Sequence, residues 1–286
     1  MRRRSPRASA KAPDPGLDFS GAGDTLSLMM VDTIEIAKLE GETLRGRLAK
    51  PLEHAMLTRD ESCLMVMVHD FPGTDMFGHD DIFGRLENSF DLIGIDTLRF
   101  DFRGFGLSDG EPEAFTLEKA IIDLKAVYEW AKAEDYSRLM ITVAGWGHLP
   151  VIMSMPKNVH ALALLWPVMD ARDFAVRNLQ AESLQNLETE EGHIELKGTP
   201  VSYQMIRDLY ELDTLPFLSR VTMPSLILHG AQDGIVPVEQ LDLARAWFRT
   251  RRIEITTYHD GVHGLPKENH RKYLYFHYEQ FVRKYI

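Results

Sequence analysis

The chain has almost no cysteine and no long apolar run. Its single cysteine, Cys63, lies in the apolar run of residues 63–68, so an intrachain disulfide is excluded. That run holds no histidine or basic residue, which favours a buried strand residue over a reactive thiol. No apolar run approaches the ~20 residues that a bilayer span requires. These absences predict a soluble protein without a membrane span.

Positive charge is also scarce. The sequence holds 32 Lys and Arg against 43 Asp and Glu, a formal net charge of -11. This balance argues against a nucleic-acid-binding surface and suits a cytoplasmic protein. With 44% hydrophobic and 26% charged residues among 286, the chain is long enough for one large domain with a small insertion.

The amino-terminal segment differs from the rest in composition. Residues 1–13 are rich in arginine, contain no acidic residue and lack the apolar core of a secretory signal. A transit peptide and a disordered tail both fit this composition. The prolines and the absence of an amphipathic pattern favour a disordered basic tail over residues 1–20. We expect residues 21–286 to form the folded domain.

Short apolar runs alternate with helical patterns along most of the chain. Two opening strands are expected at residues 25–37 and 41–48, the second with the period-2 pattern of an exposed antiparallel strand. Buried strands are expected at residues 64–68, 97–100, 139–144, 161–166, 225–229 and 253–258. Helices are expected at residues 116–133, 174–187, 240–249 and 276–285. This alternation predicts an α/β fold, a mixed but mostly parallel sheet with helices on both faces.

Residues 170–215 interrupt the alternation. They begin with a polar, glutamate-rich helical stretch, which is typical of an insertion that covers an active site. A surface helix pair with no such role fits the same pattern. Apolar side chains of this segment such as Phe174, Tyr203 and Tyr210 would line a pocket or pack the insertion onto the domain, and we favour packing for most of them.

Glycine-rich polar segments follow several of the expected strands. Open parallel sheets bind ligands at the carboxyl ends of their strands, so these segments are expected to meet at one edge of the sheet. They span residues 69–73, 101–110, 145–149, 229–237 and 260–264.

The order and spacing of these segments resemble the α/β-hydrolase superfamily, closest to its serine aminopeptidase-like and acyl-hydrolase branch. The resemblance runs from about Gly41 to the carboxyl terminus. It implies an α/β-hydrolase fold with a small helical lid, descended from hydrolases of ester, thioester or amide bonds. It implies no cofactor and no metal, and a small-molecule or acyl ligand as partner, and it leaves the oligomeric state open.

The resemblance also assigns the catalytic acid and base. In the family, H-G-x-x-D-x-x-V-P supplies the acid and a late G-x-H-G supplies the base, which match Asp233 and His263. The carboxylate of such a pair fixes the imidazole tautomer and stabilises its protonated form. The family's oxyanion amides fall on Phe71 and His148.

A further family motif, D-x-R-G-x-G-x-S-x-G, forms a structural turn. It matches residues 101–110, and the resemblance assigns a fold-holding role to Asp101, Arg103 and Ser108.

The family's nucleophile is missing. In the G-x-S-x-G frame over residues 145–149, Gly147 stands in place of the serine and Leu149 in place of the last glycine. Asp70 replaces the glycine that usually follows the histidine of the oxyanion segment, and Pro156 shortens the helix after the elbow. Without the hydroxyl no acyl-enzyme forms, and loss of a triad member leaves only ~10³–10⁴-fold catalysis over water.

Three functions follow from this pattern. The favoured one is a degenerate hydrolase that binds a small apolar or acyl ligand. The second is an enzyme that uses the His263–Asp233 pair as a general base on water or substrate. The third is weak residual esterase activity through a water molecule in the place of the serine side chain.

Overall fold

The architecture is known from a computed structural model, which describes residues 29–51, 63–70, 82–88, 94–179, 192–196 and 198–285. The expected basic tail at residues 1–20 lies outside the described residues, as does Phe71. No helix within the described ranges is long and apolar enough to cross a bilayer.

An eight-stranded sheet in the order β1-β2-β4-β3-β5-β6-β9-β10 forms the centre of the domain. The pairs β1·β2 and β2·β4 are antiparallel and all the other pairs are parallel. This confirms the predicted mixed, mostly parallel sheet. The strands are β1 Met29–Leu39, β2 Glu42–Pro51, β3 Cys63–Val68, β4 Asp96–Phe100, β5 Arg138–Ala144, β6 Val159–Leu165, β9 Ser225–Gly230 and β10 Ile253–Tyr258.

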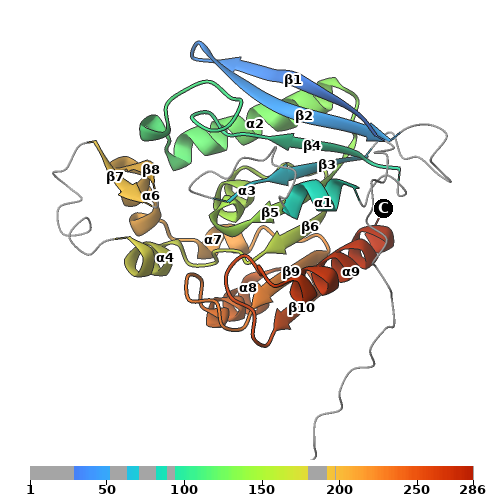
Figure 1. Cartoon of the computed structure of the whole chain (residues 1–286), viewed down its shortest axis with the longest axis vertical. Coiled ribbons are helices and arrows are strands. Elements are labelled where there is room, and N and C mark those ends of the chain that lie inside the picture. The colour runs from blue at the N-terminus through green and yellow to red at the C-terminus, as the bar shows by residue number, and fades with distance from the viewer. Residues whose placement is uncertain are drawn as a thin grey trace, which may run out of the picture.

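Helices cover both faces of the sheet, because the parallel strands are apolar on both sides. One apolar core joins the sheet to α2 Leu117–Ala133, α3 His148–Ser154 and α8 Leu241–Trp247. The other joins it to α1 Ile82–Asn88 and α9 Glu268–Tyr285. In Figure 1 the sheet runs from β1 at the top to β10 at the bottom, with α1 and α9 on the same side of it.

The insertion after β6 contains more elements than the sequence predicts. It comprises α4 Ala171–Asn178, the antiparallel pair β7 His193–Leu196 and β8 Thr199–Ser202, α6 Tyr203–Glu211 and α7 Leu215–Leu218. The helix expected at residues 174–187 is described only as far as Asn178. Figure 1 shows α4, α6, β7 and β8 gathered beside one end of the sheet.

Met205, Ile206 and Leu209 of α6 are buried in the larger core, so this helix packs the insertion onto the domain. That contact agrees with the packing role expected for most of the insertion's apolar residues.

The segment that positions the site is the turn after β5. All residues of β5 but the first are buried, as the apolar pattern of residues 139–144 predicts. The strand passes into a single 3-10 turn, η3 Gly145–Gly147, and then into the short helix α3. The helix ends at Ser154, since Pro156 and the start of β6 at Val159 leave no room for another turn.

Candidate functional site

Three side chains from distant parts of the chain meet where β3, β9 and β10 end. His263 Nδ1 lies 2.8 Å from Asp233 Oδ2, and His263 Nε2 lies 3.4 Å from Asp70 Oδ2. The loops that carry the first pair are joined by a hydrogen bond of 2.8 Å from the Gln232 amide to the Gly261 carbonyl. His263 is therefore placed between two carboxylates, one of which the sequence did not assign to it.

The loop after β9 holds Asp233 firmly. Its Oδ1 accepts hydrogen bonds of 2.9 Å from the amides of Ile235 and Val236, and Oδ2 faces His263. Beneath it, His229 Nε2 donates to the Val236 carbonyl over 2.9 Å. Burial acts to raise the pKa of Asp233, but the bond from His263, its charge and the two amides outweigh burial and hold the pKa below its ordinary value.

The protonation of His263 follows from its two partners. Burial alone would lower the pKa of this imidazole, but the hydrogen bonds to Asp233 and Asp70 and the charges of both carboxylates raise it to about 9. At neutral pH the ring is thus an imidazolium that donates from both nitrogens. The Trp166 ring, at the end of β6, lies edge-on to it with the centroids 6.0 Å apart.

Asp70 occupies the space in front of the turn after β5. Its Oδ1 accepts a hydrogen bond of 3.1 Å from the amide of Trp146, while Oδ2 faces His263. Gly145 has a φ of +52°, and a Cβ built on it would fall 1.9 Å from Asp70 Oδ1. The carboxylate and a side chain at position 145 therefore exclude each other.

Gly147, the expected vacant nucleophile position, is not brought to this cluster. It lies in the right-handed helical region at φ -52°, and a Cβ built on it would meet the His69 carbonyl oxygen at 2.5 Å. Gly145, two residues earlier, is the glycine that faces Asp70. Gly147 instead allows the close approach of the turn to the end of β3.

His148 does not offer its amide to the site. That N–H is directed to the carbonyls of Gly145 and Trp146 within the 3-10 turn, so the amide that faces the cluster belongs to Trp146. The His148 side chain is buried and its Nδ1 donates to the Val168 carbonyl over 3.0 Å. Burial lowers the pKa of His148 to about 4, so the ring is neutral.

His69 is a contributor that sequence reasoning treated only as part of a motif. It is fully buried at the end of β3, and its Nδ1 donates to the Asp70 carbonyl over 2.7 Å. Its Nε2 accepts from the Phe102 amide at 3.2 Å, in the turn after β4. Burial lowers the pKa of His69 to about 4, which keeps this bridging ring neutral. The ring fixes the backbone from which the Asp70 side chain projects.

The turn after β4 is held by the three residues that match the family's structural motif. Asp101 Oδ2 accepts from the Leu107 amide at 2.9 Å, and Ser108 Oγ donates to the Asp101 carbonyl at 2.6 Å. Arg103 is buried against Asp123 of α2, with Nε 2.7 Å from Oδ1. These contacts all hold the turn itself or fasten it to neighbouring elements.

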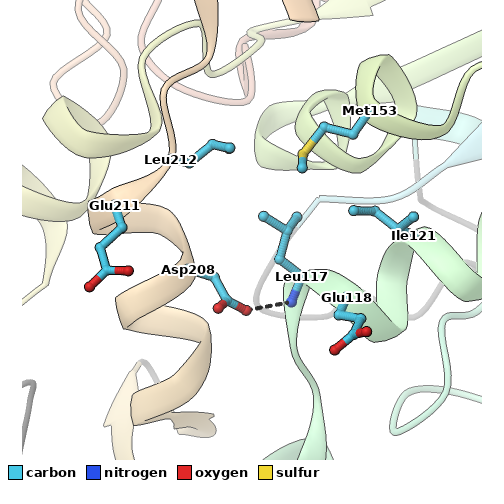
Figure 2. A pocket seen from close by; sticks show the side chains of 7 residues that line it. All are labelled: Leu117, Glu118, Ile121, Met153, Asp208, Glu211 and Leu212. Atoms are coloured by element: carbon cyan, nitrogen blue, oxygen red, sulfur yellow. Dashed lines mark hydrogen bonds between the residues drawn. The ribbon is translucent and has the colours of Figure 1, made fainter.

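A separate pocket of about 340 Å³ opens between α2, α3 and α6. Figure 2 shows its apolar residues and its carboxylates, with the Asp208 side chain accepting a hydrogen bond from the Leu117 amide. The lining residues are Leu117, Glu118, Ile121, Met153, Asp208, Glu211 and Leu212. None of them belongs to the cluster around His263, so this pocket and the chemically distinctive site do not coincide.

The comparisons with known proteins support the fold. Neither a protein-family model nor a curated protein sequence matches the chain. Among solved structures, Est1E from Butyrivibrio proteoclasticus with ferulic acid bound superposes with a TM-score of 0.75 at 22% identity, covering 88% of this chain and 98% of that one.

Two further structures agree. The esterase Pf2001 from Pyrococcus furiosus gives a TM-score of 0.65 at 18% identity over 90% of this chain and 93% of its own. Mouse alpha/beta hydrolase domain-containing protein 10 gives 0.67 at 17% identity over 89% and 99%. Together with the strand order, these likenesses show that the chain has the α/β-hydrolase fold.

Proposed function

We propose that this protein is a hydrolase-fold protein without serine acyl-enzyme chemistry, whose site binds a small apolar or acyl ligand. The observation that carries the proposal is the position of the Asp70 carboxylate. One of its oxygens accepts a hydrogen bond from the Trp146 amide, the group that would stabilise an oxyanion. The other oxygen faces His263 Nε2. In this proposal Gly145, and not Gly147, is the vacant nucleophile position.

The geometry of Gly145 supports this change of frame. A nucleophile elbow holds its serine in a strained turn directly after the strand, and Gly145 is the residue with positive φ at that point. The corresponding frame is Val143-x-Gly145-x-Gly147, in which Gly147 takes the place of the final glycine. Its close approach to the His69 carbonyl explains why a glycine is needed there.

Two alternatives are less well supported. A general base must be neutral before it takes a proton, whereas the two carboxylates raise the pKa of His263 to about 9. A residual esterase would need a water molecule in the space of the serine side chain, and that space holds the Asp70 carboxylate. Of the two, the general-base alternative keeps one observation in its favour, the 2.8 Å contact between His263 and Asp233.

A pair of double variants tests the proposal. Replacing Asp70 with Gly and Gly145 with Ser removes the obstructing carboxylate and restores a hydroxyl beside His263. We expect this variant to be labelled covalently by a fluorophosphonate probe, and the wild-type protein to remain unlabelled. The matched control is Asp70→Gly with Gly147→Ser, which should also remain unlabelled, because that side chain would point at the His69 carbonyl.

The possible outcomes distinguish the proposal from its alternatives. Labelling of the wild-type protein, or ester turnover that His263→Ala abolishes, would overturn the proposal. If only the variant with Asp70→Gly and Gly147→Ser were labelled, the vacant nucleophile position would be Gly147, as expected from the sequence. Binding itself is checked by the thermal shift that small aromatic acids produce, because the structural neighbour Est1E holds ferulic acid.

A further inference from the structure

The pocket between α2, α3 and α6 lies apart from the cluster around His263 and combines two kinds of surface. Its volume of about 340 Å³ is at the lower end of the range for small-molecule pockets, about 300–1,000 Å³. Figure 2 shows its apolar side chains gathered together, with the carboxylates along one side of them. The apolar residues are Leu117, Ile121, Met153 and Leu212, and the carboxylates belong to Glu118, Asp208 and Glu211.

Asp208 presents an oriented carboxylate to this pocket. Its Oδ2 accepts a hydrogen bond of 3.2 Å from the Leu117 amide at the start of α2, and its Oδ1 accepts one of 2.7 Å from Gln204 Nε2. An ionised carboxylate has about four acceptor positions, and both of these donors are neutral. Asp208 therefore keeps its charge and has room for a further donor, and it is in place before a ligand binds.

The protein's own cations do not occupy the pocket. None of the described residues that line it is a lysine, arginine or histidine. Lys119, the neighbour of a lining residue, faces Glu42 with its Nζ 3.9 Å away. Arg207 donates to a side-chain amide of its own helix, and Arg220 donates to the Met153 carbonyl. A cation in the pocket would thus be attracted by the carboxylates, and an anion would be repelled.

A bare metal ion does not fit this arrangement. Across the part of the chain that the structure describes, no group of three or more His, Cys, Asp or Glu side chains is placed to hold a metal ion. Glu118 and Glu211 are exposed, and exposed ion pairs alone hold a cation only weakly. The affinity must therefore come largely from apolar surface that the ligand covers, while the carboxylates select the sign of its charge.

From these features we infer that the pocket between α2, α3 and α6 is a second binding site, which takes a small organic ammonium ion with an apolar body, such as an arylalkylamine. The apolar body contacts the four apolar side chains, and the ammonium group donates to Asp208 between the two exposed carboxylates. Because α2 and α3 belong to the domain and α6 to the insertion, this ligand joins the two. The inference does not depend on the proposed function, since the two sites share no residue.

The experiment titrates the full chain with phenethylamine in a calorimeter, beside three analogues. Phenethyl alcohol has the apolar body without the charge, ethylamine has the charge without the body, and hydrocinnamate has the opposite charge. We expect phenethylamine to bind and to raise the melting temperature. Each analogue should bind about tenfold more weakly or worse.

A double variant with a matched control locates the charge. Glu118→Gln with Glu211→Gln removes two exposed carboxylates and leaves Asp208 in place, so it should weaken phenethylamine about fivefold or more without changing the affinity for phenethyl alcohol. The control, Glu268→Gln with Glu279→Gln, removes two charges from α9. Glu268 lies in the first turn of its helix, as Glu118 does in α2. The control should bind phenethylamine as the wild-type protein does.

Methyl NMR locates the apolar body without a substitution in the pocket. On titration with phenethylamine the Met153 methyl signal should shift, because this side chain lines the pocket. The methyl signal of Met30, which is exposed on the edge strand β1, should not shift.

Four results would each overturn the inference: no binding of phenethylamine, equal binding of the amine and the alcohol, equal weakening in the two double variants, or an unshifted Met153 signal. Binding of the amine at the Asp70 carboxylate instead would leave its affinity unchanged in the Glu118 and Glu211 variant, and this too would overturn it. None of these results would affect the proposed function, which fails instead if the wild-type protein reacts with the fluorophosphonate.

Discussion

At the scale of single residues, a serine and a carboxylate make different demands on the same histidine. A serine hydroxyl is neutral and leaves the imidazole ready to accept a proton. The Asp70 carboxylate adds a second negative charge beside the ring, and with Asp233 it raises the pKa of His263 to about 9. Changing the partner thus converts a proton acceptor into a proton donor at neutral pH, while the bond to Asp233 stays the same.

The raised pKa of His263 predicts that the stability of the folded chain depends on pH. His263 binds its proton more tightly in the folded chain, where its pKa is about 9, than in the unfolded chain, where it is near 6.5. The stabilisation is therefore complete below about pH 6.5 and is lost as the pH rises through 9. The loss should be on the order of 3 kcal/mol in the free energy of unfolding, measured by urea denaturation across this range.

The variant Asp70→Asn is the control for that measurement. It removes one of the two charges that raise the pKa of His263, so the decline above pH 6.5 should become shallower. An NMR titration of the ring should show the same downward shift directly. An unchanged His263 pKa in this variant would mean that Asp70 and His263 do not interact.

At the scale of elements, the turn after β5 shows where sequence reasoning succeeds and where it stops. The strand at residues 139–144 was predicted almost to its ends, because a buried apolar run followed by glycines has few other interpretations. The proposed motif frame lies two residues before the one expected from the sequence, because Gly145 and Gly147 both fit a G-x-G pattern. What separates them is the positive φ of Gly145 and the atoms that each Cβ would meet. Neither property is written in the local sequence.

The local sequence was also insufficient to predict other elements of the structure. Helix α9 begins at Glu268, eight residues before the expected start, because its first two turns are largely polar. Its buried stripe consists of His270, Leu274, Tyr278, Phe281 and Val282. The pair β7·β8 was not expected, since two strands of four residues are too short to show a period. Asp70 was identified as a departure from the family, but its contact with His263 spans 193 positions of sequence.

The two glycines should respond differently to substitution. Gly147→Ala places a Cβ 2.5 Å from the His69 carbonyl, a backbone atom that cannot rotate away, and should cost about 1–3 kcal/mol of stability. Gly145→Ala places a Cβ against the Asp70 carboxylate, so the part of its cost that comes from this overlap should disappear when Asp70 is also replaced by glycine. The strain of a side chain at φ +52° should remain in both backgrounds.

Urea denaturation of the three single and two double variants measures this coupling. An equal cost of Gly145→Ala with and without Asp70 would contradict the exclusion of one group by the other. The cost of Gly147→Ala should not change when Asp70 is removed.

At the scale of the whole molecule, the site depends on loops that are fastened to the sheet from several directions. Arg103, in the turn after β4, is 1% exposed and pairs with Asp123 of α2. Its Nη1 also reaches Glu40 and Glu42, at the turn between β1 and β2. The same turn carries Phe102, whose amide binds His69 beside Asp70. One buried ion pair thus connects the antiparallel edge of the sheet, a covering helix and the segment that positions the site.

Asp123→Ala should therefore destabilise the entire domain. It leaves the Arg103 guanidinium buried without its main partner, which typically costs about 3–5 kcal/mol. The matched control is Glu279→Ala, which breaks an exposed pair with Arg283 within α9 and should cost under about 1 kcal/mol. Chemical denaturation followed by tryptophan fluorescence compares the two, since Trp146 is buried beside the turn, with its ring centroid 6.2 Å from that of Phe102. Equal costs for the two variants would show that the turn is held by its own hydrogen bonds and not by the ion pair. In that case the position of Asp70 would depend on His69 and the turn alone. The helices on the α2 face of the sheet would then stabilise only the hydrophobic core.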